Sequence, residues 1–257
     1  MTGDVMPRVV VITGGSQNIG LAIGQRFLEA GAVVIAADIS APADKRMEFV
    51  RTDITRESDV EALMDGVVRS HGHLDVLVNN AGISVEVPIQ EMTECQWEQV
   101  MNVNVKGTFL TTKHALKPMT CEGASMPAIV NISSIEALGA NPLHAAYAAS
   151  KGAISALTHN IALEYGAMGI RCNAVAPGWI NTPFNDALLS NYANRATVES
   201  QIRALHPVGR LGLVTDIAEA VFWLASSAAA FVTGQELVVD GGRLSKLPLP
   251  TTAKPDD

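Results

Sequence analysis

The feature that most constrains the fold is a glycine turn near the start of the chain, because it stands between a predicted strand and a predicted helix. The short β-branched run Arg8–Thr13 is typical of a buried strand. The turn Gly14–Gly20 follows at once, and Leu21–Ala30 then shows apolar residues at helical spacing, with Gly31 as the stop. This is the context that a dinucleotide site requires, because backbone N–H groups and the positive end of a helix then face the pyrophosphate.

A second strand that ends in an acid strengthens this prediction. The run Ala32–Asp38 reads as a buried strand, and Asp38 stands eighteen residues after Gly20, near the expected place of a ribose-binding carboxylate. A carboxylate accepts hydrogen bonds from both ribose hydroxyls and repels a 2′-phosphate. Residues 15–18 and 39–44 contain no Lys or Arg. The sequence therefore predicts NAD as the cofactor, in preference to NADP.

The rest of the chain alternates between strand-like and helical runs. The further predicted strands are Met47–Asp53, Leu74–Asn79, Ala128–Ser133, Ile170–Ala176 and Glu236–Asp240. Between them we expect one helix that begins near Glu57, helices from after Asn79 to about Lys117, a helix that contains Tyr147, and a helix near Thr215–Ser226. The alternation predicts one α/β domain of Rossmann type, a doubly wound parallel sheet of about seven strands with helices on both faces. Ligands then bind at the carboxyl ends of the strands. The residues that follow strand-like runs, and so are expected along that edge, are Gly14, Asp38, Asp53, Asn80, Ser134 and Pro177.

Tyr147 and Lys151 lie four residues apart in a predicted helix, and Ser134 precedes the tyrosine by thirteen residues. Residues i and i+4 share one helix face, so the phenol and the ammonium project into the same space. At about 4 Å and an effective dielectric of about 20 their attraction is about 4 kcal/mol. This lowers the pKa of the tyrosine by at most about three units and predicts a general base. Two unrelated residues on a helix would show the same spacing, and the glycine turn is what favours the chemical interpretation.

Several motifs, in order and at the right spacing, resemble the short-chain dehydrogenase/reductase family over nearly the whole chain. They are Thr13-Gly14 with Gly20 for the cofactor turn, Asn79–Gly82 for the segment along the cofactor, Asn104, Ser134, Tyr147 and Lys151 for the catalytic tetrad, Pro177-Gly178 with Ile180 and Thr182 for the segment that holds the carboxamide, and Gly234 with Asp240–Gly242 for the last strand. One departure is Asn18, where the family usually has glycine. Asparagine tolerates a positive φ, so we expect the turn to form.

The resemblance implies hydride transfer between a nicotinamide and a secondary alcohol or ketone. In that reaction Tyr147 would exchange the proton with the substrate oxygen, and Ser134 would hydrogen-bond that oxygen. Lys151 would lower the pKa of the tyrosine and hold the nicotinamide ribose. Asn104 would position a water that passes protons towards Lys151; the alternative is an asparagine at a helix kink or cap.

The resemblance also implies the lining of the site. The residues expected to contact the cofactor are Gly14, Gln17, Asn18, Ile19, Gly20, Asp38, Asp53, Ile54, Asn80, Ala81, Gly82, Tyr147, Lys151, Pro177, Gly178, Ile180 and Thr182. An N-cap of the next helix is the alternative for Asp53. Glu136, His144, Trp179 and Phe184 are candidates for the substrate pocket. A solvated loop acid is the favoured interpretation of Glu136, and His144 is more often a bystander where a tyrosine is the base.

Two rival functions stay open. A 3-oxoacyl thioester reductase of the same fold commonly uses NADP and meets an acidic carrier, and both Asp38 and the formal net charge of −8 count against it. A non-catalytic dinucleotide-binding regulator predicts an incomplete tetrad, whereas all four residues are present.

Composition excludes other classes. The negative charge argues against nucleic-acid binding, which needs a basic surface. No apolar run has the length of a membrane span, and the start of the sequence has no signal-peptide core. The cysteines Cys95, Cys121 and Cys172 are odd in number and, like the histidines, show no metal-ligand spacing. We therefore expect a cytoplasmic protein with reduced thiols, no metal and no membrane partner.

The expected domain covers residues 1–242, with a substrate flap at about 183–207 and a proline-containing tail at 243–257. A plain surface helix is the alternative for the flap, and the tail is either a disordered terminus or a cover for a neighbouring subunit. The predicted helix Ala145–Leu157 is rich in small residues that let another helix approach. The resemblance implies homodimers that pair into a homotetramer, although close packing inside one subunit fits the same residues.

Overall fold

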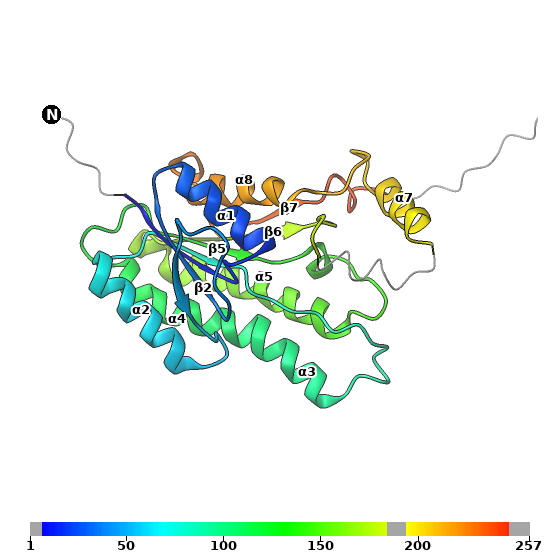
Figure 1. The fold of residues 1–257 in the computed structure, drawn as a ribbon, viewed down its shortest axis with the longest axis horizontal. Helices are drawn as coiled ribbons and strands as arrows, with labels where there is room; N and C mark the ends of the chain where they lie inside the picture. Colours follow the sequence, from blue (N-terminus) through cyan, green and yellow to red (C-terminus); the bar gives the residue numbers. More distant parts are fainter. Residues whose placement is uncertain (1–6, 184–193, 247–257) are drawn as a thin grey trace, which may run out of the picture.

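The computed structural model describes residues 7–183 and 194–246 (Figure 1). Seven parallel strands form one sheet in the order β3-β2-β1-β4-β5-β6-β7. The strands are β1 (Val9–Thr13), β2 (Val33–Asp38), β3 (Glu48–Arg51), β4 (Val76–Asn79), β5 (Ala128–Ile132), β6 (Arg171–Pro177) and β7 (Glu236–Val239). The order reverses between β1 and β4, which is where a doubly wound sheet opens its binding crevice. The predicted doubly wound parallel sheet is confirmed.

Helices cover both faces of the sheet (Figure 1). The helices α1 (Asn18–Glu29) and α8 (Val214–Ala225) lie on one face, and α2 (Glu57–His71), α4 (Gly107–Met119) and α5 (Ala145–Tyr165) lie on the other. The remaining helical elements are α3 (Glu94–Met101), the π-helix η1 (Asn102–Lys106), the 3₁₀ turns η2 (Ile135–Ala137), η3 (Gly166–Met168) and η4 (Ser227–Ala229), and α7 (Arg195–Leu205). Within the described ranges, no helix combines the length and the apolar character needed to cross a bilayer.

The core lies in two layers because the central strands are buried on both sides. Along β1, Val10 and Ile12 pack towards α1 and α8, whereas Val9 and Val11 pack towards α2, α4 and α5. A strand buried on both faces needs apolar residues at every position. This is why β1 reads as a continuous β-branched run.

The first and the last long helices of the chain pack against each other. The rings of Phe27 in α1 and Phe222 in α8 lie 5.2 Å apart, edge to face. The guanidinium of Arg26 covers the Phe222 ring at 3.6 Å and pairs with Glu219 at 2.7 Å. Residues far apart in sequence therefore close one face of the sheet.

Some element bounds differ from the sequence-based expectation. Helix α1 begins at Asn18, three residues before Leu21, because the last turn residues already enter the helix. Helix α5 continues past Leu157 to Tyr165, since it meets neither proline nor a helix-ending glycine before Gly166. In the predicted flap, residues 195–205 form α7, and Phe184 lies outside the described residues.

Candidate active site

A pocket of about 400 Å³ opens at the carboxyl ends of the strands. It gathers most of the predicted site residues from both halves of the sheet, as the order of the strands requires. Those that line it are Gly14, Gln17, Asn18, Ile19, Asp38, Asp53, Ile54, Asn80, Ala81, Gly82, Ser134, Glu136, His144, Tyr147, Lys151, Pro177, Gly178, Trp179, Ile180 and Thr182. Gly20 and Asn104 lie behind this surface and support it.

The glycine turn is shaped by close approaches that leave no room for side chains. Gly14 has φ +61°, and a Cβ on Gly20 would stand 2.1 Å from the carbonyl oxygen of Gly14. Only glycine fits such an approach. Asn18 adopts φ 49°, the positive value expected from its place in the turn. The departure from the family pattern therefore leaves the turn intact.

Two strand ends are fastened together beside this turn. Thr13 Oγ1 accepts hydrogen bonds from the backbone N–H groups of Asn80 (3.0 Å) and Ala81 (3.1 Å). In return, Asn80 Nδ2 donates to the carbonyl oxygens of Thr13 (3.0 Å) and Gly14 (2.9 Å). The ends of β1 and β4 thus form one rigid floor for a ligand.

The carboxylate of Asp38 is fixed at the end of β2. Its Oδ2 accepts from the N–H of Ser16 at 3.1 Å, and its Oδ1 accepts from the N–H of Ile39 at 2.7 Å and of Ser40 at 3.3 Å. Among the described lining residues, Lys and Arg occur only as Lys151 on α5 and Arg243 after β7, whereas the acids Asp38 and Asp53 follow β2 and β3.

Asp53 is held within its own turn. Its Oδ1 accepts from the backbone N–H (3.0 Å) and from Oγ1 (2.7 Å) of Thr55. These hydrogen bonds lower the pKa of the Asp53 carboxyl. The N-cap of α2 is Arg56, so the alternative of Asp53 as the N-cap is wrong.

Tyr147 and Lys151 project from the first turns of α5 towards Ser134, which follows β5. The Ser134 side chain lies close enough to Tyr147 to favour its ionised form. Lys151 Nζ donates to the carbonyl oxygen of Ile132 at 2.7 Å and lies 5.5 Å from the centre of the Tyr147 ring. A proton donor, a hydroxyl and a cation thus meet in one pocket.

Burial dominates the electrostatics of this group. It raises the pKa of Tyr147 to about 12, although the hydrogen bond from Ser134 opposes it, and it lowers the pKa of Lys151 to about 8. The expected lowering of the Tyr147 pKa by Lys151 is not found in this structure, because desolvation disfavours both charged forms. The depressed pKa of Lys151 shows how strongly the pocket disfavours an isolated charge.

Asn104 lies in the π-helix η1 and is 1% exposed. Its Nδ2 donates to the carbonyl oxygen of Ile83 and to Ser150 Oγ, both at 2.9 Å, and its Oδ1 accepts from the N–H of Ile83 at 2.9 Å. A π-turn is a local distortion often found at functional sites. The backbone of Asn104 thus lies at a helix distortion, as the alternative interpretation expected. Its side-chain amide in addition joins the loop after β4 to α5.

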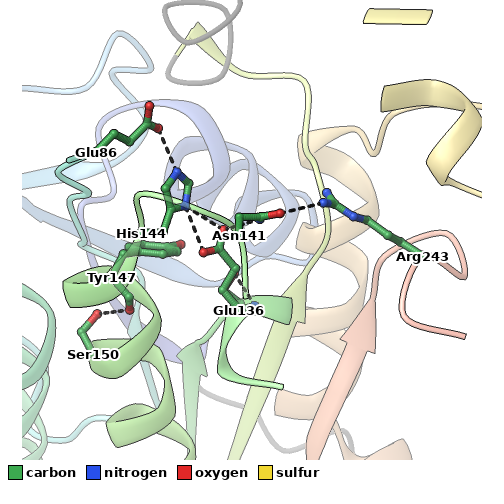
Figure 2. Close-up of polar contacts among 8 residues, drawn as sticks. Glu86, Glu136, Asn141, His144, Tyr147, Ser150 and Arg243 are labelled. Atoms are coloured by element: carbon green, nitrogen blue, oxygen red, sulfur yellow. Dashed lines mark hydrogen bonds and ion pairs between the residues drawn. The ribbon is translucent and has the colours of Figure 1, made fainter. Parts of the chain in front are cut away.

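A chain of polar contacts joins Glu86, His144, Glu136, Asn141 and Arg243 (Figure 2), and all of these except Glu86 line the pocket. We call these five residues the rim. His144 Nδ1 lies 2.9 Å from both carboxylate oxygens of Glu136, and Nε2 lies 3.1 Å from Glu86 Oε1. Asn141 donates to Glu136 at 2.9 Å and accepts from Arg243 at 3.2 Å. The Glu136 side chain is 10% exposed, so its interpretation as a solvated loop acid does not hold.

Sequence reasoning missed three members of this rim, namely Glu86, Asn141 and Arg243. Arg243 was assigned to the tail, yet it lines the pocket. It follows β7 by four residues, in a turn where the N–H of Leu244 donates to Asp240 Oδ2 at 2.7 Å. The rule that ligands bind at the carboxyl ends of parallel strands applies to β7 as well, and it would have pointed to this arginine.

Two further polar atoms of the pocket have no hydrogen-bond partner among the described residues. They are Ser84 Oγ and Trp179 Nε1, both buried. Buried hydroxyl and indole groups normally have a partner. Both residues line the pocket, so part of the hydrogen-bonding capacity of its described lining is unused.

Comparison with known proteins agrees with this geometry. A family profile described as "Enoyl-(Acyl carrier protein) reductase" matches residues 14–243. The chain is 40% identical over 246 residues to the cis-4-hydroxycyclohexanecarboxylate dehydrogenase of Sinomonas cyclohexanicum, covering 91% of this chain and 96% of the relative.

Two solved structures share the fold and a clear sequence likeness. The ligand-free aldohexose dehydrogenase of Thermoplasma acidophilum is 36% identical with a TM-score of 0.92, over 96% of this chain and 98% of that one. The NADP-bound structure of ElxO is 34% identical with a TM-score of 0.84, over 94% of this chain and 100% of that one.

Proposed function

The chain belongs to the short-chain dehydrogenase/reductase family, and from this membership we propose that it is an NAD-dependent oxidoreductase acting on a secondary alcohol or the corresponding ketone. The observation that carries the proposal is the convergence of Ser134, Tyr147 and Lys151 in the same pocket as Asp38. We call the part of the pocket around the glycine turn and Asp38 the nucleotide end, and the part around Ser134, Tyr147 and Lys151 the chemical end.

The nucleotide end fits a dinucleotide. Gly20 approaches Gly14 closely, and the N-cap residue Gln17 makes no side-chain cap on α1, so N–H groups at the start of this helix would be offered to a pyrophosphate. Asp38 would bind the ribose hydroxyls and disfavour a 2′-phosphate. When bound, the nicotinamide supplies the hydride acceptor or donor.

The residues of the chemical end would transfer the proton of the substrate hydroxyl. During alcohol oxidation Tyr147 would take the proton of the substrate hydroxyl, and in the reverse direction it would return it. Ser134, whose side chain lies beside Tyr147, would hydrogen-bond the same substrate oxygen. Lys151 would place a positive charge beside the phenolate as it forms, and would hold the nicotinamide ribose. Asn104 would hold the loop of Ile83 and the helix α5 at a fixed separation.

The rim favours a particular class of alcohol. Glu136, Asn141, His144 and Arg243 offer donors and acceptors in the pocket, and Ser84, whose hydroxyl has no partner among the described residues, also lines it. The named relatives act on a carboxylated cyclohexanol and on an aldohexose. We therefore favour a ring-bearing secondary alcohol with further polar substituents.

Initial rates with NAD and NADP across a substrate panel test the proposal. The panel contains cyclohexanol, cis-4-hydroxycyclohexanecarboxylate, aldohexoses, acyclic polyols and 3-hydroxyacyl thioesters. We expect turnover with NAD on the polar cyclic alcohols, and a loss of about 100- to 10,000-fold in kcat for Tyr147→Phe. Normal turnover by Tyr147→Phe would refute the assigned role of the tyrosine.

A 3-oxoacyl thioester reductase is the second candidate, since the family profile carries an acyl-carrier reductase description and ElxO binds NADP. Turnover of thioesters with NADP in preference to NAD would favour it. The absence of turnover on every substrate, with normal NADH binding, would favour the regulator.

We also propose that the protein assembles as a homotetramer. A shallow, largely apolar groove runs between α5 and the segment from η1 to α4. It is lined by Met101, Asn102, Val105, Lys106, Phe109, Ala153, Ala156, Leu157 and Asn160. The small residues on α5 leave room for the helices of a second copy.

A further inference from the structure

His144 stands between two carboxylates, and each of its ring nitrogens contacts one of them (Figure 2). A neutral imidazole has one N–H and one lone pair, whereas an ionised carboxylate only accepts hydrogen bonds. Between two ionised carboxylates, both contacts are hydrogen bonds only when both ring nitrogens carry protons. With both glutamates ionised, this arrangement therefore favours an imidazolium.

The groups around the ring agree with this charge. The hydrogen bond to Glu136 and the charges of Glu136 and Glu86 raise the pKa of His144 above its ordinary value, while burial opposes them. Tyr147, from the same helix, presents its ring edge-on at 6.1 Å. Arg243 reaches the cluster only through the neutral amide of Asn141, on the far side of Glu136.

The three groups belong to three different walls of the pocket. Glu136 stands in η2, two residues after Ser134. Glu86 belongs to the loop after β4, whose residues Ile83 and Ser84 line the pocket. His144 is the N-cap residue of α5, three residues before Tyr147. One protonated ring therefore joins the serine turn, this loop and the tyrosine helix.

We propose that His144 acts as a positioning residue for the reaction proposed above, by clamping these three walls together in its imidazolium form. Loss of one proton would turn a lone pair towards a carboxylate and leave two carboxylates with no cation between them. The Glu86 contact would break first, because Glu86 makes one contact with the ring and its side chain is 27% exposed, against 10% for Glu136. The part of the loop around Glu86 would then be held less firmly beside the substrate, where the Val87 N–H still donates to the carbonyl oxygen of Leu143 at 3.0 Å. Asn104 continues to hold Ile83, and the nucleotide end keeps its own contacts.

Variants of His144 separate the clamp from a general role in folding. Phenylalanine removes both donors, whereas arginine keeps the charge and donates to two carboxylates. We expect His144→Phe to lower kcat/KM for the alcohol about 10- to 100-fold, the loss expected for a charged hydrogen bond, with the Kd for NAD unchanged. His144→Arg should recover activity to within about tenfold of the wild type.

A matched control is the pair of His71 and Glu48, which joins α2 to β3 outside the pocket with its Nε2 3.1 Å from the carboxylate. His71→Phe removes a histidine–glutamate contact of the same kind and should leave kcat/KM unchanged. If His144→Phe behaved like His71→Phe, the clamp would be refuted.

The pH dependence of kcat/KM distinguishes the clamp from a contact that only stabilises the fold, because only the clamp depends on the protonation of His144. We expect the ratio of wild-type kcat/KM to that of His144→Arg to fall as the pH rises through the His144 pKa. The titration of Tyr147 is common to both proteins and cancels in this ratio. Glu86→Gln removes one of the two charges and should move the fall to lower pH. A ratio that does not change with pH would contradict the proposal.

A direct measurement needs no substrate. Nitrogen-15 NMR of the wild type should show both ring nitrogens of His144 protonated at pH 7, and His144→Phe should displace the amide signals of Ser134 and Ile83. A neutral ring at pH 7 would overturn the clamp even in an active enzyme. If the wild type turned over no alcohol, the proposed function would fail, while these spectra would still decide on the clamp.

Discussion

At the scale of single residues, Asp38 shows how a backbone arrangement can preset a preference between ligands. Three backbone N–H groups hold its two oxygens at the end of β2. A carboxylate held in this way cannot swing aside at low cost, since it would leave three donors unpaired. The proposed preference for NAD would therefore belong to this side chain and its turn together.

Replacement of Asp38 tests that assignment. We expect Asp38→Ser to lower kcat/KM with NAD by about 10- to 100-fold, because a charged hydrogen-bond acceptor is lost. Activity with NADP should rise, since a repelling charge is removed. Initial rates with the two cofactors give the ratio, and Asp65→Ser on the exposed face of α2 is the control. An unchanged NAD-to-NADP ratio would show that other residues select the cofactor.

Lys151 predicts an unusual dependence of stability on pH. Burial lowers its pKa from 10.5 to about 8, so the folded protein bears the cost of a buried ammonium below about pH 8. The cost disappears as the pH rises from about 8 to above 10.5. Lys151→Met carries no such cost, so the wild type should gain about 3 kcal/mol relative to this variant across the window.

Chemical denaturation of the two proteins between pH 7 and 11 measures this gain. Tyr147 titrates in the upper part of the range in both proteins and does not contribute to the difference. Lys117→Met, which replaces an exposed lysine of α4, should show no such trend. A constant difference between wild type and Lys151→Met would mean that the ammonium is well solvated.

At the scale of elements, the sequence predicted the existence and type of each strand. The central strands are buried on both faces and leave continuous apolar runs, whereas the exposed edge strand β3 was predicted from the alternation of strands and helices. The helix ends were less well predicted. Helix α1, for example, begins at Asn18, which the sequence had placed in the glycine turn. The rim of the pocket was the least predictable part. Glu86, Asn141 and Arg243 converge from three loops, and no spacing in the sequence records that convergence.

Two glycines on helices predict opposite responses to the same substitution. Gly20→Ala places a Cβ 2.1 Å from a backbone oxygen of the cofactor turn, whereas the nearest atom to a Cβ on Gly66 lies at 3.8 Å. We expect Gly20→Ala to abolish NADH binding, because the turn must open. Gly66→Ala should stabilise α2 by about 0.5–1 kcal/mol.

Fluorescence titration with NADH and thermal unfolding distinguish the two outcomes. Normal NADH affinity in Gly20→Ala would show that the turn is more adaptable than its packing indicates.

At the scale of the whole molecule, the groove between α4 and α5 predicts the assembly. Phe109 projects from α4 with 50% exposure beside the small residues of α5. We expect Phe109→Glu to shift a tetramer to smaller species, because a charge would have to be buried in an apolar interface. Sedimentation velocity measures this shift, and Glu61→Gln on α2 is the control. A wild-type protein that sediments as a monomer would contradict the homotetramer.

The contact between α1 and α8 also has a consequence for how the chain is made. Phe27 of the first helix leaves the ribosome long before its partner Phe222 is synthesised. At about 5–20 residues per second the interval is about 10–40 s, far longer than a local collapse takes. During that interval one apolar face of the nascent domain has no native cover. We expect the growing chain to depend on a chaperone at this stage, and the step that buries Phe27 to come late in folding.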